Sequence, residues 1–217
     1  MQHRKLYAGL GGLVLAGTVG VVGIQASSAN ESPRTAAAPG TVQLDAPLRS
    51  LNDSGASGHA HAEIKGRKAH VHIRARGLAR NLPHAQHLHF GAEARNECPS
   101  VFDDDNFDHR LNVAEGVPAY GPILKSLTTS GDTSPKSGLA VDRFPTTPKG
   151  IEKYERTIDF APGAVLRAIK SGKGVIVIHG VDHNGNGTYD FEGAGASELD
   201  PSLPAEATDP ALCGVLR

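Results

Sequence analysis

Short runs in which apolar and polar residues alternate, or in which β-branched residues follow one another, recur along most of this chain. An alternation with a period of two places successive side chains on opposite faces of a strand. Gly, Pro, Asn and Asp separate the runs, as they do in the turns between strands. The runs that predict strands are His61–Ile64, His70–Arg76, Gln86–Phe90, Ile123–Leu127, Tyr154–Phe160 and Val175–His179.

Helical periodicity is weak by comparison. Ala164–Lys170 is long enough for about two turns of helix, and little else repeats with a helical period. Many short strands with turn residues between them favour an all-β fold, an antiparallel sandwich or barrel, over an α/β fold. The polar connections Glu93–Pro122 and Asp182–Leu212 are too long for simple turns, so we expect functional residues there.

The N-terminal segment has the organisation of a secretory signal. His3, Arg4 and Lys5 precede the uncharged run Leu6–Ile24, and small residues follow that run up to Ala29. We therefore expect residues 1–29 to be a cleaved signal peptide, with an uncleaved N-terminal membrane anchor as the alternative. Either interpretation makes the rest of the chain secreted or extracytoplasmic. Residues 30–47, rich in Ala, Pro, Ser and Thr, predict a flexible linker, and one domain is expected over residues 48–217.

Charge and cysteine content narrow the function classes. The 217 residues include 22 Lys and Arg against 23 Asp and Glu, a formal net charge of −1, so no strong positive field attracts nucleic acid. Cys98 and Cys213 are the two cysteines, and in an exported chain one disulfide is their simplest use. Two unrelated buried thiols are the alternative.

Histidine is abundant, with 11 residues, and part of it is arranged in three His-x-His pairs. On a strand, residues i and i+2 lie on one face, so each pair presents two imidazoles side by side in a chelating arrangement. Imidazoles without Met or free thiolate ligands suit Cu(II) or Zn(II) better than Ca(II) or Mg(II). The pairs are His59/His61, His70/His72 and His87/His89.

The three pairs differ in their context. His59/His61 lies near the predicted start of the domain, where half-exposed strand positions are the simpler interpretation. For His70/His72, an exposed strand face and a supporting role around a metal site stay equally open. His87/His89 indicates a metal site more sharply. So does His179, whose polar ring ends the strongly apolar run Val175–Ile178 and needs a partner there.

Several motifs in order along the chain resemble the copper/zinc superoxide dismutase family. They are Gly77-Leu78, His87-Leu88-His89, Cys98, Val177-Ile178-His179 and Leu212-Cys213-Gly214-Val215. The resemblance implies an eight-stranded Greek-key sandwich or flattened barrel, with copper held by His87, His89 and His179 as the catalytic centre. It also implies a disulfide from Cys98 to Cys213 and dismutation of superoxide to dioxygen and hydrogen peroxide. The chain also resembles the related CHRD domains, which share a His-x-His strand and imply a non-catalytic extracellular interaction module.

The sequence departs from the dismutase pattern in two places. Between Cys98 and Val175 it has one histidine, His109, so the family's zinc site of three histidines and an aspartate cannot be built there. The resemblance therefore implies the copper-only type, with copper expected and zinc not. His109 is either the fourth copper ligand, with Asp103, Asp105 or Asp108 orienting it, or an ordinary histidine of a solvated acidic loop.

The second departure concerns the anionic substrate. Pro210 stands where the family has an arginine that attracts superoxide, and Arg95 or Arg110 would have to replace it by proximity. The segment Asp182–Asp190 is like the first half of a calcium loop but has Gly193 at the position of the final acid, so a turn is the simpler interpretation. His183 in this segment is a further candidate to approach the copper.

Three functions follow from these patterns. The first is an exported copper-binding protein of the superoxide dismutase type, with superoxide as its substrate if it is an enzyme. The second is a non-catalytic CHRD-type interaction module, and the third is a copper or zinc storage protein that uses the excess of histidine. The pattern leaves the oligomeric state open.

Overall fold

A computed structural model of the chain describes residues 40–217. The predicted signal peptide or anchor, residues 1–29, and the first part of the predicted linker lie outside the described residues. Among residues 40–217, no helix is both long enough and apolar enough to cross a membrane.

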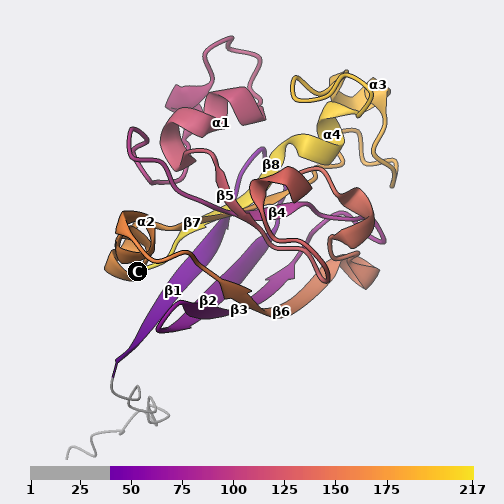
Figure 1. The fold of residues 1–217 in the computed structure, drawn as a ribbon. Coiled ribbons are helices and arrows are strands. Elements are labelled where there is room, and N and C mark those ends of the chain that lie inside the picture. The colour runs from indigo at the N-terminus through magenta and orange to yellow at the C-terminus, as the bar shows by residue number, and fades with distance from the viewer. Residues whose placement is uncertain (1–39) are drawn as a thin grey trace, which may run out of the picture. The chain divides into compact units, whose positions relative to one another are not determined.

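Eight strands form one antiparallel sheet in the order β5-β4-β7-β8-β1-β2-β3-β6 (Figure 1). The strands are β1 (Thr41–Ser50), β2 (Ser57–Lys65), β3 (Lys68–Arg76), β4 (Gln86–His89), β5 (Ile123–Ser126), β6 (Ile151–Asp159), β7 (Val175–His179) and β8 (Pro210–Val215). β1 joins the two arms of the sheet, because its first eight residues pair with β2 while Arg49 and Ser50 pair with β8. The all-β fold predicted from the strand pattern is confirmed.

The two arms bury their faces differently. In β1, β2, β3 and β6, buried residues, all apolar except Glu152, alternate with more exposed and mostly polar ones, so one face packs on the core and the other meets solvent. Leu88, Ile176 and Ile178 from β4 and β7 complete that core. β4 and β7 are buried at every position, because helices and loops cover their second face. On this second face Tyr120 packs against Val177.

Short helices lie in the long connections. They are α1 (Val113–Tyr120), α2 (Ala164–Ala168), α3 (Phe191–Ala194) and α4 (Ala205–Thr208). Figure 1 shows α1 in one connection, and α3 and α4 in another, on the same side of the sheet. Single turns of 3₁₀ helix cover Val101–Asp103, Pro135–Ser137, Val141–Arg143 and Pro148–Gly150, and a π turn covers Ile169–Lys173.

The first strand begins earlier than the sequence predicts. β1 starts at Thr41, so residues 41–47 belong to the sheet and not to the predicted linker. Leu44, Ala46 and Leu48 alternate on its buried face, but Ala and Pro47 give the segment the composition of a tether. The composition of this segment therefore predicts a linker, although pairing with β2 stabilises it as a strand.

One disulfide links the connection before α1 to the last strand. Cys98 and Cys213 are joined, with their Cα atoms 5.7 Å apart, and the described residues contain no free cysteine. The predicted pairing is confirmed, and the alternative of two buried thiols is excluded. Because Cys213 lies in β8, the bond fastens the loop after β4 to the sheet.

Candidate metal centre

Three buried imidazoles meet on the covered face of β4 and β7. His87 and His89 of β4 pair with Val177 and Val175 of β7, and His179 ends β7 on the same face. One ring nitrogen of each histidine lies within 4.8 Å of the corresponding nitrogens of the other two. The side chains are 3%, 2% and 3% exposed in the order of the chain. The sequence motifs thus predict a group that the fold brings together.

Irregularities in the sheet occur at two of these residues. The register of β4 against β5 shifts between Leu88 and His89, and that of β7 against β8 shifts between Ile178 and His179. Such bulges bend a strand and redirect the side chain at that position. Local backbone geometry therefore sets the direction of two of the three imidazoles.

A backbone carbonyl fixes the tautomer of each ring. His87 Nε2 donates to the Gly138 carbonyl at 3.0 Å, and His89 Nδ1 donates to the Gly121 carbonyl at 2.8 Å. His179 Nδ1 donates to the Thr208 carbonyl at 2.6 Å. Since a carbonyl oxygen only accepts, each of these ring nitrogens carries the proton. The second nitrogen of each neutral ring is then a free lone pair.

Those three lone-pair nitrogens have no hydrogen-bond partner. His87 Nδ1, His89 Nε2 and His179 Nε2 are all buried and unpaired. Leaving a buried polar atom unsatisfied costs about 1 to 3 kcal/mol, so three of them side by side need an explanation. A metal ion with imidazole ligands satisfies all three at once, and the donor set suits copper or zinc.

Burial keeps the three rings neutral. Burial first, and then the neighbouring His179, lower the pKa of His89 to about 3, and burial lowers the pKa of His179 to about 4. The pKa of His87 is also well below its usual value of 6.5, first because of burial and then because of the other two histidines. At neutral pH no proton competes with a metal for these nitrogens.

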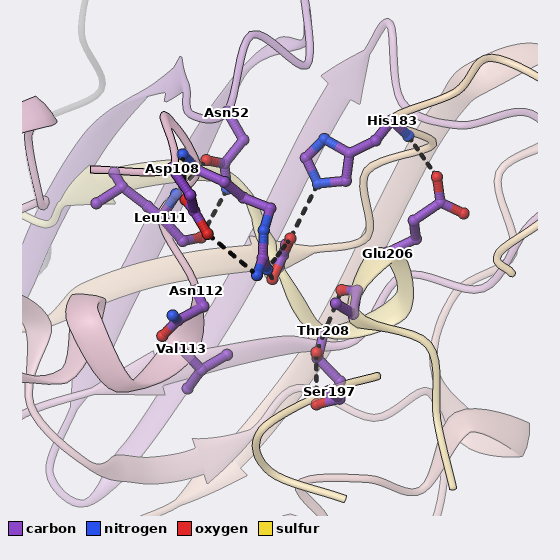
Figure 2. A network of polar contacts seen from close by, with 12 residues as sticks. Asn52, Asp108, Leu111, Asn112, Val113, His183, Ser197, Glu206 and Thr208 are labelled. Carbon is purple, nitrogen blue, oxygen red and sulfur yellow. Dashed lines mark hydrogen bonds and ion pairs between the residues drawn. The ribbon is translucent and has the colours of Figure 1, made fainter. Parts of the chain in front are cut away.

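A buried ionic network supports the carbonyl that holds His179. Asp209, the residue after Thr208, is fully buried and accepts hydrogen bonds from Arg110 Nη1 at 3.0 and 2.9 Å. His183 Nε2 lies 2.9 Å from the same carboxylate, and Figure 2 shows this network around the labelled Asp108, His183 and Thr208. Nothing in the sequence indicates this group, because 99 residues separate Arg110 from Asp209.

The fourth predicted ligand is not brought to the three histidines. His109 is exposed in its loop, where its backbone N–H donates to Asp104, and it lines a separate polar cavity beside Arg110 and His183. His183 itself contacts Asp209 and does not join the group. Arg95 and Arg110 are the two candidates to replace the arginine that attracts superoxide in the dismutase family. Both are paired with carboxylates: Arg110 with Asp209, and Arg95 with Glu97 and Asp103.

A cavity of about 420 Å³ reaches the three histidines. Its wall is mainly apolar, and among its lining residues, all in the described part of the chain, Lys136 has the one side chain with a positive charge. The apolar lining comes from Val113, Val117, Ile123, Leu139 and Leu199. Sequence patterns did not single out Lys136, which lies in the 3₁₀ turn Pro135–Ser137 next to Gly138.

The calcium-like segment forms a turn held by its own side chains. Asp182 accepts hydrogen bonds from the backbone N–H groups of Asn186 and Gly187. Asp190 caps the N-terminus of α3 through the backbone of Glu192 and Gly193. These carboxylates organise the loop, as the simpler interpretation of the sequence requires.

Comparisons with known proteins add little at this distance. No family model matches the chain, and no curated protein matches it. A search of solved structures finds a point mutant of superoxide dismutase 5 from Candida albicans, which is 15% identical to this chain. The match covers 81% of this chain and 90% of that one, with a TM-score of 0.37. A similarity this distant leaves the function to the geometry of the site.

Proposed function

We propose that this chain is an exported copper protein of the superoxide dismutase type that converts superoxide to dioxygen and hydrogen peroxide. The observation that carries the proposal is the convergence of three buried, unpartnered imidazole nitrogens, on His87, His89 and His179. The order of motifs around these residues, which resembles the copper/zinc superoxide dismutases, supports the same assignment. The disulfide supports export, because such bonds persist outside reducing compartments.

The donor set suits copper or zinc, and the resemblance of the motifs to the copper/zinc superoxide dismutases selects copper. The three ligands are all imidazoles, with no thiolate and no carboxylate among them. Copper, when bound here, supplies the one-electron steps that oxidise one superoxide to dioxygen and reduce a second, with two protons, to hydrogen peroxide. Zinc is not expected at the family's second position, because the loop after Cys98 lacks the ligands for it.

The protein's own residues bind and select. Carbonyl oxygens of Gly121, Gly138 and Thr208 hold the imidazoles in fixed orientations, so no side chain has to rearrange during a one-electron step. The cavity is small and apolar, which limits access to small molecules. Lys136 at its wall provides a positive charge that attracts a small anion such as superoxide.

Pulse radiolysis of the copper-loaded chain tests the proposal. We expect second-order decay of superoxide catalysed by copper alone, with no gain when Zn²⁺ is added. His179→Gln removes one ligand and should abolish catalysis, whereas His59→Gln on the exposed face of β2 should leave it unchanged. If superoxide decays no faster with the copper-loaded wild type than with His179→Gln, the enzyme proposal is overturned. The non-catalytic interaction module is then the function that stands.

A further inference from the structure

A second set of histidines lies on the solvent face of the other arm. The register of the sheet places Asp45, His61, His72 and Glu155 in one row across β1, β2, β3 and β6. His70 stands two residues before His72 on the same face of β3. These are the positions at which the strands alternate away from the core, so the row faces solvent.

Within this row, three side chains come close enough to share an ion. The ligand atoms of His70, His72 and Glu155 all lie within 4.8 Å of one another. His70 Nε2 is 3.1 Å from Glu155 Oε1, and His72 Nδ1 is 3.6 Å from Glu155 Oε2. In a tetrahedral zinc site with bonds of about 2.1 Å, neighbouring ligand atoms are about 3.4 Å apart. The two observed separations, which run to different oxygens of Glu155, are close to that spacing, so small side-chain rotations bring one ligand atom of each residue to an ion.

A third imidazole stands beside this group. The ring of His61 is 6.4 Å from that of His72, and its Nδ1 lies 3.0 Å from Asp45 Oδ1. A carboxylate on one ring nitrogen orients a histidine and leaves the other nitrogen free for a metal, as in many zinc sites. Asp45 also contacts His59, at 2.9 Å, but His59 lies opposite Arg74 whereas His61 lies opposite His72. His61 itself is outside the group of ligand atoms within 4.8 Å, so its ring has to turn toward His72 to bind.

We propose that His70, His72 and Glu155 form a second metal site, exposed on the sheet, which binds a borderline divalent cation of the zinc type. His61 supplies the fourth ligand, and Asp45 positions it. The ligands come from three neighbouring strands, so the bound ion cross-links β2, β3 and β6. This site shares no residue with the buried histidines, and it lies away from the loop after Cys98 in which zinc was not expected.

Zinc titration of the full metal-free chain tests this site, followed through the side-chain ¹H–¹⁵N correlations of its histidines. We expect the signals of His70 and His72 to move together and saturate at one equivalent of added Zn²⁺ for this site. His72→Gln should weaken binding there at least tenfold. The matched control is His59→Gln, which takes away another histidine of the same sheet face and should bind Zn²⁺ as the wild type does.

Thermal unfolding gives a second readout. Zn²⁺ that binds only the folded state raises the melting temperature, so we expect a rise with wild type and His59→Gln that is reduced in His72→Gln and in Glu155→Gln. Each of these side chains is partly or fully exposed, so the variants should fold. The proposal is overturned if His72→Gln binds as tightly as wild type, if only the buried histidines respond, or if every exposed histidine shifts in parallel without saturation.

Discussion

Each imidazole of the group His87, His89 and His179 has two ring nitrogens in different surroundings. One donates to a carbonyl, and the other is an unpaired acceptor aimed at its neighbours. The ring of His87 uses its Nδ1 as the free atom, while His89 and His179 use Nε2. The spacing His87-x-His89 could be read from the sequence as a chelating pair. The choice of nitrogen could not, because it depends on the carbonyls of Gly138 and Gly121, which are distant in the chain.

The core also contains a buried carboxyl group, that of Glu152. Glu152 of β6 faces inward and is almost fully buried, and burial raises its pKa to about 8, while Gln86 lowers it in part. Its usual value is 4.5, so between about pH 4.5 and 8 the folded state holds a proton that the unfolded state has lost. This group therefore makes the protein less stable as the pH rises through that range, by up to about 1.4 kcal/mol per pH unit.

Glu152→Gln should remove this dependence. Between pH 7 and 8 the buried histidines are neutral in the folded state but still partly protonated in the unfolded state, which raises stability with pH in wild type and variant alike, so the effect of Glu152 is the difference between the two slopes. We expect urea unfolding of the metal-free proteins to show that wild type loses stability relative to Glu152→Gln from pH 7 to pH 8, by about 1 kcal/mol. Glu155→Gln on the exposed face of the same strand is the control. Equal slopes in wild type and Glu152→Gln would show that Glu152 ionises freely in the fold.

At the scale of elements, three short helices end at the buried histidines. Gly121 follows the last residue of α1, Gly138 follows a 3₁₀ turn, and Thr208 is the last residue of α4. The last carbonyls of a helix have no partner inside it and carry partial negative charge, so they accept readily from an imidazole N–H. At Gly121, φ is 85° and a Cβ would lie 2.6 Å from Gly91 N, so glycine is required.

These helices show why the sequence predicts only part of the site. Strong alternation in β2, β3 and β6 and the apolar run of β7 made the sheet predictable. The helices α1 and α4 and the 3₁₀ turn Pro135–Ser137 are eight residues or fewer and lack a long apolar period, so the sequence predicts no helix there. Their ends position the imidazoles, and that role depends on tertiary packing that no local pattern records.

Asp209 connects α4 to the rest of the structure and should matter for stability. Asp209→Asn leaves the partly buried Arg110 and His183 without their carboxylate, so we expect a loss of about 2 to 4 kcal/mol in the free energy of unfolding. Asp108, which lies 3.6 Å from Arg110 at the surface, is the control, and Asp108→Asn should cost less than about 1 kcal/mol. Urea unfolding measures both. Equal costs would contradict the assigned importance of the buried pair.

The charge of Lys136, in the 3₁₀ turn Pro135–Ser137, should affect the rate at which superoxide reaches the cavity. Lys136→Gln removes the positive charge at the cavity, and we expect the rate constant with superoxide to fall about threefold at low salt, with a smaller difference at high salt. Lys153→Gln makes the same change of net charge on the exposed face of β6. Stopped-flow or pulse radiolysis at two ionic strengths distinguishes them. Identical effects of both substitutions would indicate only a change in net charge.

On the scale of the whole molecule, the sheet separates two kinds of histidine cluster. The arm with β4 and β7 buries three imidazoles under loops, and the arm with β2 and β3 exposes four on its outer face. The excess of histidine in the sequence is thus divided between a closed site and an open one. The exposed pairs keep the strict alternation of their strands, so their face was predictable. Their meeting with Glu155 depends on the pairing of β3 with β6.

The disulfide ties the loop over the closed site to the end of the chain. Cys98 and Cys213 are 115 residues apart, and closing a loop of that length removes about 4 to 5 kcal/mol of unfolded-state entropy in the simple model. Reduction, or the double variant Cys98→Ser/Cys213→Ser, should therefore lower the free energy of unfolding by about 3 to 5 kcal/mol. Urea unfolding with and without reductant measures the difference. A loss below about 1 kcal/mol would mean that the loop is held by its other contacts.

The most direct test of the account is the electron paramagnetic resonance spectrum of the chain with one equivalent of Cu(II). If the three buried lone pairs hold the metal, the spectrum will show one copper species with nitrogen couplings from three imidazoles. His179→Gln will lose one of these couplings, while His72→Gln on the exposed face will keep all three. A spectrum that is unchanged in His179→Gln, or that changes in His72→Gln instead, would contradict the assignment of His87, His89 and His179 as the copper ligands.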